Sequence, residues 1–329
     1  MLNYCTLFNS AYLSRGLAMY YSLEQCSGSF HLYIFAFDEE CYKHLRNLEL
    51  KHATIISLSE FEDEELLSVK PDRTAGEYCW TCTSSTIWYC IKTYALDQCT
   101  YIDADLLFFS DPKVLIDEMG DDSVLITSHN YSPEHDQSAL SGIYCVQFIT
   151  FKNTEEGMRV LNWWRKACIE WCYRRFEDGK FGDQKYLDDW TERFTGVHVL
   201  QNPGGGVAPW NNLQYQIKPA SRVIVHHQPS AQESELVFYH FHDFRYCKRD
   251  VVRLTAEQYS LTPDVVRYIY KPYISMLTEA EKSIRSLGEN VTFHEPLLDL
   301  DWIMKNTGRK FTFFLTGHYK NYYKRGTLK

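Results

Sequence analysis

Two aspartates separated by a single residue are the feature of this sequence that most clearly suggests chemistry. Asp103 and Asp105 flank Ala104, and the residues around them (101–109) are otherwise apolar. In an extended chain alternate side chains point to the same side, so both carboxylates can converge on one cation. Two like charges in apolar surroundings cost several kcal/mol unless a counter-ion neutralises them. Carboxylate oxygens favour Mg²⁺ or Mn²⁺, and the pattern therefore predicts a divalent metal site.

A second string offers a third ligand to the same metal. His240 and His242 alternate within residues 237–243, so both imidazoles would lie on one face of a strand. An imidazole ligand shifts the preferred metal towards Mn²⁺. The spacing alone does not choose between the two histidines.

The segments around these residues predict an α/β fold. Short apolar runs predict strands at residues 2–8, 32–37, 53–58 and 100–102, with helical patterns between them, including one at 87–96. This alternation predicts a mostly parallel sheet flanked by helices. Ligands of such sheets bind at the carboxyl ends of the strands, where the aspartates stand.

The second half of the chain continues the pattern more irregularly. We expect strands at 124–127, 144–151, 223–225 and 236–241, and helices at 155–173 and after residue 181. The chain then divides into a catalytic domain at 1–250 and a helical C-terminal region at 251–329 that ends in a basic, aromatic tail.

Composition excludes one class of partner and suggests a location. The chain has 329 residues with 34 basic and 43 acidic side chains, a net charge of −9 that argues against nucleic-acid binding. Its 11 scattered cysteines indicate reduced thiols in a cytoplasmic protein. The first residues lack a leader pattern and no apolar run reaches the roughly 18 residues that span a bilayer, so we expect neither a leader nor a membrane span. Residues 305–329 carry basic and aromatic side chains but no acidic ones, which suits peripheral contact with the inner face of an anionic membrane.

Several ordered blocks point to a family. They are TLFN with YL and GL near the start, YIDADLLFFSDP, SGIYCVQFITFKN, FGDQKYLDDW, APWNN and HFHDFR. In this order they resemble GT-A-fold glycosyltransferases. The resemblance is nearest to the retaining, family 8-like branch that includes glycogenin-like enzymes and bacterial lipopolysaccharide galactosyl- and glucosyltransferases. It covers about residues 2–246.

The resemblance implies roles at matching positions. The base and ribose of a nucleotide-sugar would contact Phe8, Asn9 and Tyr12, and its diphosphate would contact Lys92 and Arg245. The turn at Asp103, Ala104 and Asp105 would hold the nucleotide and the metal, and His240 matches the family's metal histidine better than His242 does. The transferred sugar would lie beside Asp183 and Gln184.

The implied activity is metal-dependent transfer of a hexose or N-acetylhexosamine from a UDP-sugar to a glycan or lipid-linked saccharide, with retention of configuration. Gln184 would then stabilise the developing cation, whereas an inverting reaction would need Asp183 as base. Two other enzyme classes fit less well. Haloacid-dehalogenase-like phosphatases carry Thr where Leu107 stands, and sugar nucleotidyltransferases need a glycine-rich basic loop after the first strand. A carbohydrate- or nucleotide-sugar-binding protein without turnover is the non-enzymatic alternative.

Overall fold

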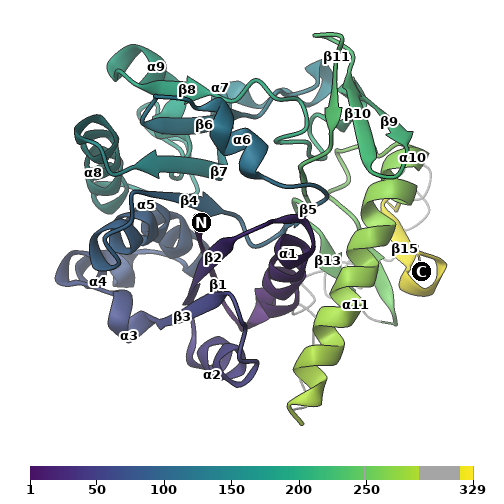
Figure 1. Ribbon diagram of the computed structural model, residues 1–329, viewed down its shortest axis with the longest axis horizontal. Helices are drawn as coiled ribbons and strands as arrows, with labels where there is room; N and C mark the ends of the chain where they lie inside the picture. The colour runs from purple at the N-terminus through teal and green to yellow at the C-terminus, as the bar shows by residue number, and fades with distance from the viewer. Residues whose placement is uncertain (248, 289–318, 329) are drawn as a thin grey trace, which may run out of the picture.

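A seven-stranded sheet forms the centre of the protein in this computed structural model, which describes residues 1–247, 249–288 and 319–328 (Figure 1). The strand order is β3-β2-β1-β4-β7-β6-β8. All neighbouring pairs are parallel except β4 with β7 and β7 with β6. The predicted mostly parallel α/β sheet is therefore confirmed. Its strands are β1 (Leu2–Phe8), β2 (Phe30–Ala36), β3 (Ala53–Ser57), β4 (Gln98–Ile102), β6 (Val124–Ser128), β7 (Tyr144–Lys152) and β8 (Val197–Val199).

Helices cover both faces of this sheet. Successive residues of β1 show why two covers are needed, since Tyr4 and Cys5 are both fully buried but belong to different apolar clusters. One cluster includes α1 (Leu13–Cys26), α2 (Glu39–Asn47), α6 (Lys113–Glu118) and α11 (Lys271–Ser286). The other includes α3 (Leu58–Phe61), α4 (Glu64–Val69), α5 (Ala75–Thr93), α8 (Glu155–Glu170) and α9 (Trp190–Arg193).

Two predicted helices differ in their bounds for local reasons. Helix α5 begins twelve residues before the expected start at 87, because Thr74 and Glu77 form a reciprocal capping box at its N-terminus. The helix expected after residue 181 is a 3₁₀ segment at Lys185–Asp189 followed by the single turn of α9. The short α7 (Ser138–Ser141) lies in the loop before β7.

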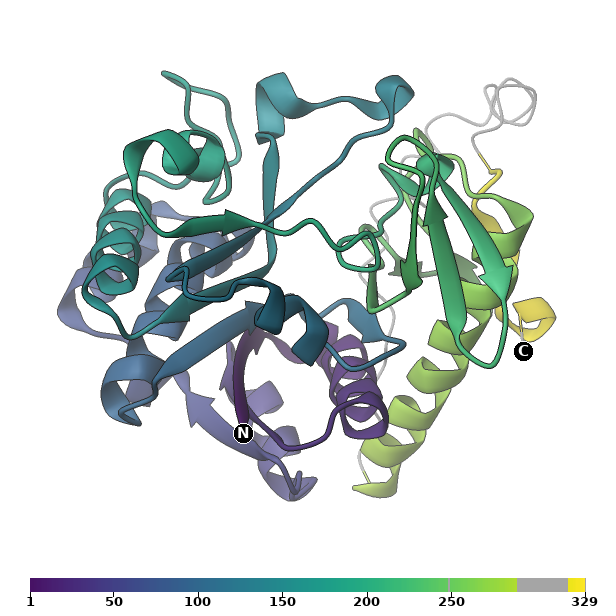
Figure 2. The ribbon, with the colours of Figure 1, turned by 45° about the horizontal axis from the view of Figure 1, so that its top comes forward.

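Within the described ranges, three small sheets lie beyond the central one. Strands β9 (Tyr215–Pro219), β10 (Val223–His227) and β11 (Gln232–Glu235) form an antiparallel meander, seen at the right of Figure 2. Strand β5 (Leu106–Phe108) pairs with β12 (Phe238–His240). Strand β14 (Val251–Arg253) lies between β13 (Arg245–Tyr246) and β15 (Tyr322–Lys324).

The C-terminal region combines helices with strands rather than being helical throughout. After α10 (Pro263–Val265) and a π-helical segment at Val266–Tyr270, α11 packs against α1 and contributes Leu277 to the same apolar cluster as Leu17. Near the end of the chain, Arg325 is buried and pairs with Glu281 at 2.7 Å. Most of the predicted membrane-contacting tail lies outside the described residues. Within the described part of the chain, no helix is long and apolar enough to cross a membrane.

Candidate active site

A large cavity opens where the predicted metal motif stands. It has a volume of about 810 Å³, within the range of small-molecule sites, and its lining residues run from Leu7 to Tyr259 along the chain. Of the residues singled out in the sequence, it brings together all but Lys92: Phe8, Asn9, Tyr12, Asp103, Ala104, Asp105, Asp183, Gln184, His240 and Arg245.

Backbone pairing sets the three metal-ligand candidates side by side. Asp103 follows the last residue of β4, and the chain turns through Ala104 into β5. Strand β5 pairs antiparallel with β12 so that Leu106 stands opposite His240, and the Phe241 N–H donates to the Asp105 carbonyl at 2.9 Å. The carboxylates thus converge through a turn at the strand end, not through one extended strand as expected.

The geometry selects His240 as the third ligand. Its Nε2 lies 3.2 Å from Asp105 Oδ1 and 3.9 Å from Asp103 Oδ2, and one ligand atom from each residue fits within 4.8 Å of the other two. His242 is not part of this group; its ring centre is 5.9 Å from that of His240, and it packs against Trp210.

The electrostatics of this triad fit a divalent cation. Burial, partly offset by His240 and reinforced by Asp105, raises the pKa of Asp103 to about 6. Burial lowers the pKa of His240, but the Asp105 charge and hydrogen bond outweigh it and hold that pKa well above its usual value. Without a metal, a proton on the imidazole balances part of the negative charge. Two carboxylates and one imidazole are also a donor set that Mn²⁺ or Mg²⁺ accepts, so the residues fit the metal.

The two residues predicted to lie beside the transferred sugar line the same cavity. Asp183 is 6% exposed, and burial followed by the charge of Asp103 raises its pKa to about 7. Its backbone is fixed by Trp164, whose indole N–H donates to the Asp183 carbonyl at 2.9 Å. Gln184 donates from Nε2 to the Ser141 carbonyl at 2.9 Å, which orients its amide within the wall.

Beside Phe8 and Tyr12, one buried acceptor has no partner among the described residues. Asn9 Oδ1 is buried without a hydrogen bond among the described residues, beside Phe8 and Tyr12 in the cavity lining. A buried unsatisfied acceptor costs about 1–3 kcal/mol, so it suits a ligand donor. Arg245, at the same cavity, is held by Asp243 at 3.0 Å.

Lys92 does not belong to this site. It is exposed near the C-terminal end of α5, whereas the cavity is lined by residues near the other end of that helix, among them Cys79 and Thr83. At 1.5 Å per residue the offset along the helix from Cys79 is about 20 Å. Because α5 leads into the start of β4, its last turn lies near the amino end of that strand. Asp103 follows the carboxyl end of β4, on the opposite side of the sheet's strand ends.

The sequence did not predict four residues that contribute to the site. Gln147 of β7 contacts His240, Arg174 lines the cavity, and the stacked rings of His129 and Tyr131 stand 4.6 Å apart in its wall. Only the strand prediction for 144–151 hinted at Gln147, as a polar residue in an apolar run. All 11 cysteines are free thiols, as the sequence predicts.

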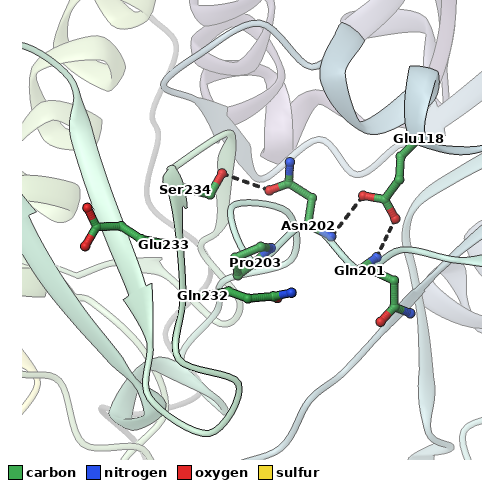
Figure 3. Close-up of a pocket in the computed structure, with 7 residues that line it drawn as sticks. All are labelled: Glu118, Gln201, Asn202, Pro203, Gln232, Glu233 and Ser234. Carbon is green, nitrogen blue, oxygen red and sulfur yellow. Dashed lines mark hydrogen bonds between the residues drawn. The ribbon is translucent and has the colours of Figure 1, made fainter.

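A second pocket, drawn in Figure 3, is lined by residues that hydrogen-bond to one another. Both carboxylate oxygens of Glu118 accept backbone N–H groups, from Gln201 at 2.6 Å and Asn202 at 3.0 Å. Asn202 in turn accepts the Ser234 hydroxyl at 3.0 Å. Its polar groups therefore satisfy one another, unlike those of the larger cavity.

Two bacterial proteins share much of this sequence. The chain is 30% identical over 292 residues to the uncharacterized protein YfnD of Bacillus subtilis (strain 168), covering 86% of this chain and 91% of YfnD. It is 33% identical over 251 residues to YfnF of the same organism, covering 74% of this chain and 81% of YfnF. The chain belongs to the YfnD/YfnF family. No protein-family model matches it.

Solved structures show which fold the YfnD/YfnF family member adopts. A galactosyltransferase, LgtC, in complex with donor and acceptor sugar analogues, aligns with a TM-score of 0.51 at 12% identity over 84% of this chain and 96% of LgtC. The bifunctional glycosyltransferase WbbM in its apo form aligns with a TM-score of 0.52 at 13% identity over 86% of this chain and 51% of WbbM. At such low identities the likeness concerns the fold, which is the predicted GT-A fold.

Proposed function

We propose that the protein is a metal-dependent glycosyltransferase of the family 8-like type. It moves a hexose or N-acetylhexosamine from a UDP-sugar to a glycan or lipid-linked saccharide, with retention of configuration. The observation that carries this proposal is the convergence of Asp103, Asp105 and His240 at the floor of the cavity that also holds Asp183 and Gln184. The GT-A fold supports it, because LgtC shares that fold and binds donor and acceptor sugar analogues.

Each end of the cavity suits one part of such a donor. The unpartnered Asn9 Oδ1 offers an acceptor to the imide N–H of uracil, and the ring of Phe8 offers an apolar contact to the base. Asp103, Asp105 and His240 would hold Mn²⁺ or Mg²⁺. Such a cation stabilises the negative charge of a departing diphosphate as a Lewis acid.

The chain's own residues would act around the anomeric carbon. Gln184 has its Nε2 bound to the Ser141 carbonyl, which leaves its amide oxygen to face positive charge at the sugar. Asp183 has its pKa raised to about 7 by burial and then by Asp103, so it can exchange a proton near neutral pH. In a retaining reaction the acceptor hydroxyl would approach from the same face as the leaving diphosphate, and Gln184 would act without a base.

A donor screen tests the proposal. The protein is mixed with MnCl₂ and each common nucleotide-sugar, and release of nucleotide is followed. We expect turnover of a UDP-hexose or UDP-N-acetylhexosamine that is lost in Asp105→Ala and kept in Asp111→Ala, an aspartate outside the cavity. No turnover of any donor, together with an unchanged melting temperature in Mn²⁺ and UDP, would contradict it. The anomeric configuration of the product, read by NMR, tests retention separately.

A further inference from the structure

A short hairpin contributes Arg174, Phe181 and Gly182 to the cavity lining. After α8 the chain reverses through Asp178 and Gly179, both with positive φ, and Glu177 and Lys180 exchange backbone hydrogen bonds at 3.1 and 2.9 Å. This is a two-residue Asp-Gly turn of the type that matches the twist of paired strands. The Gly182 N–H donates to the Tyr173 carbonyl at 3.0 Å and closes the base of the hairpin beside Asp183. Residues on its arms are therefore held in place.

The other two cationic side chains of this hairpin have partners. Arg175 pairs with Glu177 at 2.6 Å and lies 4.2 Å from the Tyr173 ring centre, while Lys180 lies over Trp171. Glu77 accepts the Arg174 backbone N–H at 2.8 Å. The Arg174 side chain itself is exposed, lines the cavity, and has no hydrogen bond or ion pair with any residue that the structure describes.

Arg174 lines the same cavity as the three metal-ligand candidates Asp103, Asp105 and His240. These candidates come from elements far along the chain from the hairpin. Arg174 thus borders the space in which a ligand of the metal would lie.

A charge balance indicates what Arg174 is for. A divalent cation would be neutralised by Asp103 and Asp105. A nucleotide-sugar carries a negative charge on each phosphate and gains more when the bond from C1 breaks and its electron pair stays on the diphosphate oxygen. Arg245 is already paired with Asp243, which Arg253 also contacts at 2.8 Å. Among the cavity-lining lysines and arginines in the described ranges, only Arg174 lacks a carboxylate partner.

We propose that Arg174 binds the diphosphate of the donor from the hairpin side and holds it as it leaves, an inference that rests on the proposed function. Guanidinium donors pair with phosphate oxygens in a bidentate manner, and such charge-assisted bonds are among the stronger ones in proteins. The diphosphate would then be held between the metal on one side and Arg174 on the other.

Calorimetric titration with MnCl₂ and UDP, UMP or uridine tests this on the full chain. We expect Arg174→Gln to weaken UDP binding by about 10- to 100-fold and to leave uridine binding unchanged, with Arg174→Lys in between. The matched control is Arg175→Gln, which removes the same charge from the next residue, outside the cavity lining, and should bind UDP as the wild type does.

Three results would overturn the inference. They are unchanged UDP affinity in Arg174→Gln, equal weakening by Arg174→Gln and Arg175→Gln, or a raised KM for the acceptor alone, which would make Arg174 an acceptor contact. In all three the wild type still binds UDP with Mn²⁺, so the proposed function survives. A wild type that binds no nucleoside diphosphate would instead remove the proposed function and this inference together. Melting temperatures of both variants verify folding.

Discussion

Gln147 Oε1 lies 2.8 Å from His240 Nδ1, and the backbone carbonyl of the same glutamine accepts the Asp103 N–H at 3.0 Å. One residue of β7 therefore fixes two of the three candidate metal ligands. As an acceptor, the amide oxygen requires a proton on Nδ1 and so leaves Nε2 to face the two carboxylates. Such partners orient metal-bound histidines in many proteins.

Gln147→Leu should therefore weaken Mn²⁺ binding by about 10- to 100-fold. The fold should tolerate the change, because leucine is of similar size and the Gln147 Nε2 is buried without a partner among the residues described. Titration with MnCl₂ measures the affinity. Thr150→Val on the same strand, which breaks a buried hydrogen bond to Thr100 away from the metal, is the control and should bind normally. Equal affinities of Gln147→Leu and wild type would show that His240 needs no such partner.

The elements that place Asp103 followed from the sequence, but the contacts around it did not. Apolar runs with clear ends predicted β1 and β4, and the rule that ligands bind at carboxyl ends of strands placed the aspartates correctly. The pairing of β5 with β12, which brings His240 to the aspartates, joins segments more than a hundred residues apart. No local pattern encodes that pairing.

The misplacement of Lys92 and the omission of Arg174 have related causes. Lys92 is close to Asp103 in the sequence, but a helix that precedes a strand ends near the amino end of that strand. Asp103 lies beyond the carboxyl end of the same strand. Attention to chain direction would have excluded Lys92. Arg174 is distant from Asp103 in the sequence. Its position depends on the turn at Asp178 and Gly179, and that Asp-Gly pair predicts a hairpin but not the surface on which the hairpin packs.

Metal affinity should rise with pH. A metal binds neutral imidazole, and Asp105 holds the pKa of His240 well above its usual value against the effect of burial. The cation must therefore displace a proton, and its apparent affinity should increase by up to about tenfold per pH unit until His240 is neutral. Titrations with MnCl₂ in buffers of different ionisation heat measure both the affinity and the proton release.

The two histidines provide the control for that pH dependence. His240→Ala should abolish most of the affinity and the proton release together, whereas His242→Ala should keep the slope, because burial and the proximity of His240 lower the pKa of His242 to about 4. An affinity independent of pH in the wild type would contradict His240 as a ligand.

Asp183 should make the metal-free protein less stable at high pH. Its pKa rises from 3.8 in the unfolded chain to about 7 in the fold, through burial and then the charge of Asp103. The folded state therefore binds the proton more tightly, and the resulting stability is fully present below pH 3.8 and lost as the pH rises through about 7. In EDTA, the melting temperature of Asp183→Asn should exceed that of the wild type by more at pH 8 than at pH 5.

The size of this effect is about 1–4 kcal/mol at pH 8, the upper end being the full shift converted to free energy. Asp189→Asn, which removes an exposed partner of Arg193, should show no such pH-dependent gain. Parallel melting curves of Asp183→Asn and wild type across this pH range would mean that the Asp183 carboxyl is solvated.

Gly16 leaves the space that the ring of Phe8, a cavity-lining residue, occupies. A Cβ at position 16 would stand 2.4 Å from two ring carbons of Phe8, so Gly16→Ala must displace that ring. We expect a loss of about 1–3 kcal/mol in the free energy of unfolding, as for other overpacked sites, and a weaker affinity for UDP. Binding of Mn²⁺ alone should remain, because the metal ligands lie on other elements. Gly28→Ala, which meets nothing within 4 Å, is the matched control for both measurements. If Gly16→Ala lost stability but kept its UDP affinity, Phe8 would serve the core and not the nucleoside.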